Sequence, residues 1–181
     1  LTNHKGGVGK TTSATNIALG LVRVLRHIRA RNTRVLLIDT DSQAHATLVT
    51  TGRKDFGTED SLHTVLMADR KDASTVLLDC IVPSMWDDDL HVLPASHLLE
   101  QAERELQGTA GAPYRIADPL AKVSHRYSAI VIDTRPSFSL MTEMGLLAAT
   151  DAIIPVEPRY LETVGLLSVI NKINEIRDGW R

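Results

Sequence analysis

The chain has 181 residues, of which 43% are hydrophobic and 23% charged, a balance that fits one folded domain and excludes extensive disorder. Its 20 basic and 22 acidic residues give a net charge of −2, so nucleic acid binding would require a local basic patch. The single cysteine, Cys80, excludes an internal disulfide and a zinc or iron–sulfur site built within this chain. We find neither a signal peptide nor an apolar run of membrane-spanning length, and we therefore expect a cytoplasmic protein.

Apolar side chains recur at helical spacing from residue 10 to about residue 29 and predict one amphipathic helix. The apolar run R-V-L-L-I-D at 34–39 then predicts a parallel strand that is covered on both faces and ends on a carboxylate. Residues 40–73 are polar and rich in turn formers, with a short helix expected at 61–67. A second short strand is expected at 90–94.

The second half of the chain continues this alternation of strands and helices. The expected elements are helices at 96–107 and 117–125, a strand at 128–133, a helix at 138–149, a strand at 151–156 and a helix at 163–176. Alternation predicts an α/β fold, a mostly parallel twisted sheet with helices on both faces, in one domain over residues 1–181. In such sheets ligands bind at the carboxyl ends of the strands.

A glycine-rich segment, K-G-G-V-G-K-T-T at residues 5–12, is the strongest functional signal in the sequence. Its glycines allow backbone N–H groups to turn inward, and the following helix adds the positive end of its dipole, so the loop should bind phosphate. Lys10 can then reach the β- and γ-phosphates of ATP or ADP, and the Thr11 hydroxyl is placed for Mg²⁺. The expected nucleotide-binding residues are Lys5, Gly6, Gly7, Val8, Gly9, Lys10, Thr11 and Thr12.

Two features depart from the ordinary P-loop pattern: His4 stands where glycine is usual, and Lys5 adds a second lysine. The segment thus resembles the deviant Walker A motif of the ParA/MinD family of P-loop ATPases, with Lys5 as the signature lysine. The resemblance implies a nucleotide-sandwich homodimer in which Lys5 reaches the partner's phosphates, as an arginine finger does. A P-loop also needs a strand before it, of which 1–2 would be the last step, so we expect truncation at both ends of the domain.

Carboxylates follow two of the predicted strands. The segment D-T-D-S-Q at 39–43 resembles a ParA segment, in which Asp39 is expected to hold the Mg²⁺ hydration shell. Asp41 is expected to position or deprotonate the attacking water, which makes it catalytic together with Lys5 and Lys10; alternatively it is a turn or capping aspartate. Asp133 ends the run A-I-V-I-D and, as a Walker B carboxylate, is expected to join Thr11 and Asp39 at the metal.

Two positions leave alternatives open. Arg135 stands where the family usually has a small residue or proline, and it either faces solvent or contacts phosphate or a partner chain. Five arginines form a basic rim on the first helix and its exit, which is either a solvated face or a DNA patch: Arg23, Arg26, Arg29, Arg31 and Arg34. Residues 153–160 also resemble ParA, whereas a following strand with adenine contacts is not found.

The resemblance implies a partitioning ATPase: an ATP-driven dimer that binds nonspecific DNA, associates with the nucleoid and hydrolyses ATP slowly when a ParB-like partner stimulates it. A MinD-like membrane-surface switch is the first alternative, although Gln43 and the lack of a C-terminal amphipathic helix count against it. A metabolic ATP-dependent ligase or synthetase on the same fold is the second. A nitrogenase-reductase-like electron carrier is excluded, because one cysteine per subunit cannot hold a four-iron cluster across a dimer.

Overall fold

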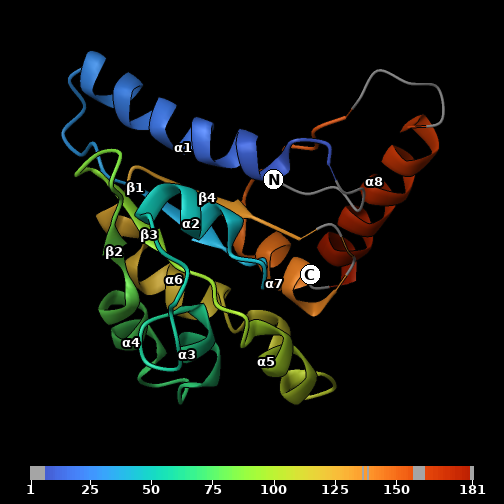
Figure 1. The fold of residues 1–181 in the computed structure, drawn as a ribbon. Helices are drawn as coiled ribbons and strands as arrows, with labels where there is room; N and C mark the ends of the chain where they lie inside the picture. Colours follow the sequence, from blue (N-terminus) through green and yellow to red (C-terminus); the bar gives the residue numbers. More distant parts are fainter. Residues whose placement is uncertain (1–6, 136, 138, 157–161, 180–181) are drawn as a thin grey trace.

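The computed structural model describes residues 7–135, 137, 139–156 and 162–179, and its centre is a four-stranded sheet (Figure 1). The strands are β1 (Val35–Asp39), β2 (Val82–Pro83), β3 (Leu90–Leu93) and β4 (Ala129–Asp133), in the order β2-β3-β1-β4. Strands β3 and β4 run parallel to β1, whereas β2 pairs antiparallel with β3. The predicted mostly parallel α/β fold is confirmed.

Helices surround this sheet, and the long helix α1 lies on the side opposite to α3 and α4 (Figure 1). The helices are α1 (Lys10–His27), α2 (His45–Thr51), α3 (Leu62–Met67), α4 (Ala73–Cys80), α5 (Leu99–Leu106), α6 (Ala117–Val123), α7 (Leu140–Ala148) and α8 (Glu162–Gly179). Short 3₁₀ turns lie at Ala112–Tyr114 and Ser124–Arg126. Among these described helices, none has the length and apolar character needed to cross a bilayer.

Strand β1 is fully buried because its side chains alternate between two hydrophobic cores. Val35 and Leu37 pack with the apolar side of α1 and with Leu90 of β3. Leu36 and Ile38 face the larger core, to which helices α3 to α7 contribute. A strand covered on both faces needs a continuous apolar run, so the sequence pattern of β1 and its structure agree.

The prediction of a strand at 151–156 is wrong. Within the described part of the chain, this segment pairs with no strand, and β4 pairs only with β1. Ile153 and Val156 are 50% and 48% exposed. An apolar, β-branched run forms a strand only where a neighbouring strand satisfies its backbone N–H and C=O groups, and none of the described strands pairs with this one.

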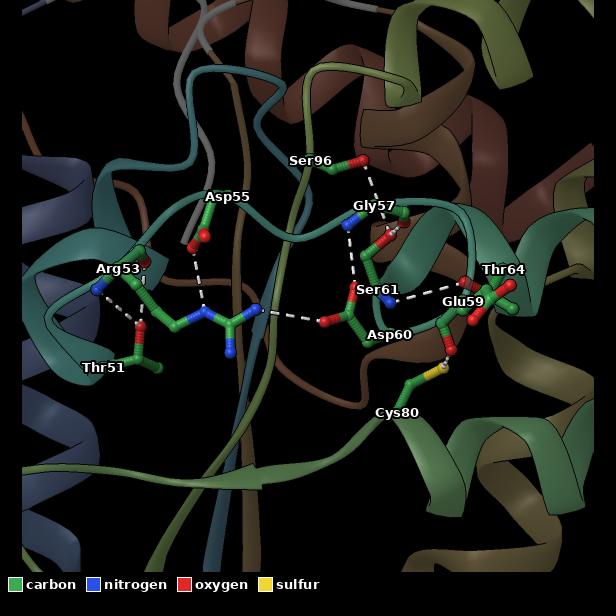
Figure 2. Close-up of polar contacts among 10 residues, drawn as sticks. All are labelled: Thr51, Arg53, Asp55, Gly57, Glu59, Asp60, Ser61, Thr64, Cys80 and Ser96. Carbon is green, nitrogen blue, oxygen red and sulfur yellow. Dashed lines mark hydrogen bonds and ion pairs between the residues drawn. The ribbon is translucent and has the colours of Figure 1, made fainter.

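The polar segment between α2 and α3 is ordered by its own side chains (Figure 2). Arg53 donates to Asp55 at 2.9 Å and to Asp60 at 3.2 Å, which places its guanidinium across the turn. The Thr64 hydroxyl accepts the Ser61 N–H at 3.4 Å in the first turn of α3. The helix expected at 61–67 is thus confirmed. Helices α2 and α4 and the two-residue strand β2 were missed.

Candidate functional site

The described part of the glycine-rich loop has the backbone conformation that phosphate binding requires. Gly7 and Gly9 have φ angles of 78° and 81°, in the left-handed region that favours glycine. Gly9 directly precedes α1, whose first turn contains no acidic residue and whose N-terminus has no side-chain cap. The first amides of α1 are therefore available to an anion. Lys5 and Gly6 lie outside the described residues, so the signature lysine stays a prediction.

Lys10 begins α1 and is only 6% exposed, which is unusual for a lysine. Burial lowers its pKa, whereas the charges of Asp133 and Asp41 raise it. Thr11 and Thr12 follow on the first turn, and Thr15 donates to the Thr11 carbonyl oxygen at 3.0 Å. The helix start thus brings a buried ammonium group and a hydroxyl close to the carboxylates at the strand ends.

Asp39 and Asp133 are paired in register at the carboxyl ends of β1 and β4. Asp39 is fully buried, and burial followed by the charge of Asp133 raises its pKa to about 7. Its carboxylate accepts the Thr47 N–H at 2.8 Å, the Thr47 hydroxyl at 2.7 Å and the Asp41 N–H at 3.0 Å. Asp39 therefore fixes the start of α2 and the loop after β1. Its predicted contact with the Mg²⁺ hydration shell stays a prediction.

Asp133 is the more weakly held of the two carboxylates. It is 1% exposed, and among the described residues the Thr11 hydroxyl lies near its oxygens without forming a hydrogen bond of normal geometry. Burial raises its pKa to about 6, against the lowering effects of the nearby Thr11 hydroxyl and the Lys10 charge. A buried carboxylate with few partners is costly unless a cation neutralises it. Asp133 beside the Thr11 hydroxyl therefore fits a hard divalent cation such as Mg²⁺.

No group of three or more His, Cys, Asp or Glu side chains that could hold a metal occurs within the described ranges. A metal here would need further oxygen ligands from water or phosphate. Mg²⁺ is the ion that is bound in this way, through one or two protein oxygens and a nucleotide.

A cavity of about 510 Å³ lies at the carboxyl edge of the sheet, next to Asp39 and Asp133, which do not themselves line it. Its lining contains Gly7, Gly9, Lys10, Thr11, Thr12, Asp41, Gln43, His45, Thr134, Arg135 and Ser137. Most of the residues predicted from the phosphate loop and from the loop after β1 thus meet in one hollow. His45, Thr134 and Ser137 were not predicted, and only their nearness in sequence to the two aspartates could have indicated them.

Asp41 is half-buried and lines this cavity. One of its carboxylate oxygens accepts the Gln43 N–H at 3.1 Å, and its carbonyl oxygen accepts the Ala44 N–H at 2.8 Å. These are the bonds of an aspartate in a turn. The turn alternative is therefore observed, and a catalytic role for Asp41 stays a prediction that the turn geometry accommodates.

The basic rim of α1 is partly neutralised. Arg26 pairs with Asp87 at 2.6 Å and with Asp89 at 2.7 Å, both in the loop before β3. The acidic run D-D-D at 87–89 thus supplies partners for an arginine of the rim. Arg26 and these aspartates are more than 60 residues apart, so the sequence alone does not predict that they pair.

Known proteins resemble this chain in sequence over nearly its whole length. A protein family described as an AAA domain matches residues 1–181. The sporulation initiation inhibitor protein Soj of Bacillus subtilis is 32% identical over 177 residues, which are 98% of this chain and 64% of that protein. The chromosome partitioning protein ParA of Myxococcus xanthus is 32% identical over 179 residues, 99% of this chain and 58% of that protein. The chain belongs to the ParA/MinD family of P-loop ATPases.

Solved structures agree with the ParA/MinD assignment. Cobyrinic acid a,c-diamide synthase from Mycobacterium smegmatis, solved with a bound ATP analog and magnesium, is 31% identical to this chain. The TM-score is 0.79, over 98% of this chain and 66% of the synthase. This chain spans less than two thirds of the length of the Soj and ParA relatives. The resemblance to the ParA/MinD family inferred from the P-loop motif is confirmed over this length.

Proposed function

We propose that this chain is the ATP-binding core of a partitioning ATPase, which binds Mg²⁺ and ATP, dimerises around the nucleotide, hydrolyses it slowly and binds nonspecific DNA in the ATP state. The observation that carries the proposal is the cavity at the sheet edge, which is lined by the glycine loop, Lys10 and Thr11, with the buried carboxylate of Asp133 close to Thr11 and Lys10. Anion and cation sites that adjoin in this way suit a metal-bound triphosphate.

The main residues in and beside the cavity have separate roles in this proposal. The amides at the start of α1 and the ammonium group of Lys10 bind phosphate oxygens, and the low exposure of Lys10 strengthens that attraction. Thr11 and Asp133 hold Mg²⁺, which when bound neutralises charge on the phosphates. Asp39 keeps the loop after β1 in place through Thr47. Asp41 orients the attacking water from the rim of the cavity.

Lys5 supplies the partner's phosphates with a second cation in the proposed homodimer, and a ParB-like protein accelerates hydrolysis. These proposals are supported by relatives named as partitioning proteins, such as ParA of Myxococcus xanthus. Nonspecific DNA binding would depend on arginines of the α1 rim other than Arg26, since Arg26 is engaged by two aspartates, or on parts of the protein beyond this chain.

The experiment uses the full-length protein, with DNA of random sequence and anionic vesicles as competing surfaces. ATP-dependent binding to DNA that weakens steeply with salt supports partitioning, since binding to phosphates releases counterions. ATP-dependent binding to the vesicles alone would replace this proposal with the MinD-like switch. The Lys10→Ala variant serves as the control that lacks the nucleotide-dependent step.

A metabolic synthetase is a second candidate, because cobyrinic acid a,c-diamide synthase is 31% identical to this chain. Such an enzyme transfers phosphate to a carboxylate before amide formation. Its signature would be ATP turnover that depends on a small carboxylic acid and is unaffected by DNA. The same full-length preparation, assayed with each addition, separates the two candidates.

A further inference from the structure

Arg135 lies in the loop after β4 and lines the same cavity as Lys10. Its guanidinium donates to the Glu103 carboxylate of α5 at 3.0 Å, and the two side chains are 24% and 17% exposed. An ion pair this sheltered is screened less than a surface pair. The loop that closes one side of the phosphate cavity is thus tied to a helix outside it.

Glu103 has a second contact that matters for what Arg135 can do. Its other carboxylate oxygen accepts the Met141 N–H at 3.3 Å, in the first turn of α7. If Arg135 leaves, Glu103 still has a donor at a helix N-terminus, where a negative charge is favourable. Release of the guanidinium therefore does not strand a buried carboxylate, which is the usual penalty for breaking such a pair.

Helix α5 also contacts a second loop of the cavity, the loop after β1. The Ser42 hydroxyl, in the loop after β1, donates to Glu100 of α5 at 2.9 Å. Glu100 and Glu103 are three residues apart and lie on one side of the helix. Helix α5 thus contacts two of the loops that line the phosphate cavity, through one glutamate for each.

The loop that carries Arg135 also contains a buried hydroxyl with no partner. The Ser137 hydroxyl lines the cavity and, among the described residues, has no hydrogen-bond partner. Buried polar atoms are normally satisfied, so an unpaired one in a binding cavity indicates a group that arrives with the ligand. This observation is independent of the ion pair and fits a loop that contacts a polar ligand.

We infer that Arg135 is a further cation of the phosphate site, which exchanges Glu103 for the terminal phosphate of a nucleoside triphosphate, and that Glu103 is the residue that positions it beforehand. The inference rests on the proposed nucleotide binding and adds a contact that distinguishes triphosphate from diphosphate. A guanidinium suits both partners, since it binds carboxylate and phosphate oxygens with the same paired N–H groups. The exchange detaches the loop after β4 from α5, so the helix is held differently in the two nucleotide states.

The test is calorimetric titration of the full-length protein with the Mg²⁺ complexes of AMP-PNP and of ADP. Arg135→Ala should weaken AMP-PNP binding by about tenfold, the value of one hydrogen-bonded charge contact, and leave ADP binding unchanged. Glu103→Gln should strengthen AMP-PNP binding, because it removes the carboxylate that competes for Arg135. Arg53→Ala is the control, since it breaks arginine–carboxylate contacts away from the cavity, with Asp55 and Asp60 between α2 and α3 (Figure 2).

Equal losses for AMP-PNP and ADP in Arg135→Ala would overturn the inference, because they would mean that the ion pair only supports the loop. Weaker AMP-PNP binding in Glu103→Gln would also overturn it. If the unmodified protein binds neither nucleotide, the proposed function fails as well. If it binds both and Arg135→Ala changes neither affinity, only this inference fails.

Discussion

Replacing Asp133 with asparagine should stabilise the nucleotide-free protein. The Asp133 carboxylate is 1% exposed, and burial outweighs the favourable effects of Thr11 and Lys10 on its charge, so the folded protein bears the cost of a desolvated charge. Asparagine has nearly the same shape and no charge. The gain in stability should be accompanied by loss of Mg²⁺-dependent nucleotide binding, as is common where a binding site stores an unfavourable charge.

The magnitude follows from the raised pKa. Burial raises the pKa of Asp133 from its ordinary 3.8 to about 6, a shift of about two units that corresponds to about 3 kcal/mol. The folded state holds this proton more tightly than the unfolded chain does. The free-energy cost of the charged Asp133 side chain is therefore fully present above about pH 6 and disappears as the pH falls toward 4. The charge of Asp133 also raises the pKa of the buried Asp39. Removing that charge relieves the repulsion between the two carboxylates, which should also stabilise the variant.

Urea denaturation with EDTA present would measure the difference. At pH 8 we expect Asp133→Asn to be about 3 kcal/mol more stable than the unmodified protein, and near pH 4 we expect the two to converge. Comparing the two proteins at each pH cancels the titration of groups they share. A variant that is less stable at pH 8 would refute the reasoning, because it would show that Asp133 is stabilised by a partner in the folded state.

Three further substitutions test the site. Thr47→Val removes a hydroxyl that donates to Asp39 and accepts the Ala95 N–H at 2.9 Å. Urea denaturation should show that the free energy of unfolding falls by about 1–3 kcal/mol. An unchanged midpoint would contradict this. Gly9→Ala places a side chain at a φ of 81° and should cost about 1 kcal/mol in the same assay; a gain would contradict the left-handed assignment. Asp41→Ala should retain ATP binding and lose turnover, and normal hydrolysis would remove its catalytic role.

The parts of the fold that the sequence predicts well are those with long, regular patterns. Helix α1 has helical spacing over five turns, and the strands β1 and β4 are apolar runs that end on aspartates. Helix α2, helix α4 and strand β2 were missed because they are short, and the two helices lie in or beside a polar, turn-rich segment. The segment 151–156 has a strand's composition, but its partner cannot be known from composition.

The candidate site, too, is only partly predictable from the sequence. The glycine loop and the aspartates at 39 and 133 are predictable, since parallel strands bring their carboxyl ends to one edge. The pairs Thr47–Asp39 and Arg135–Glu103 are not, because each depends on how a helix packs against a loop. From the sequence alone, Asp39 and Asp133 look equivalent. In the structure Asp39 accepts three hydrogen bonds, whereas Asp133 has only the nearby Thr11 hydroxyl and Lys10 charge among the described residues.

The central claim is that the start of α1 and its buried lysine form a triphosphate site. Calorimetric titration of the full-length protein with Mg²⁺ and AMP-PNP, compared with Lys10→Ala, tests it most directly. We expect one site per chain in the unmodified protein and no detectable binding in a Lys10→Ala variant whose circular dichroism shows it to be folded. Equal affinity in the two proteins would contradict the account.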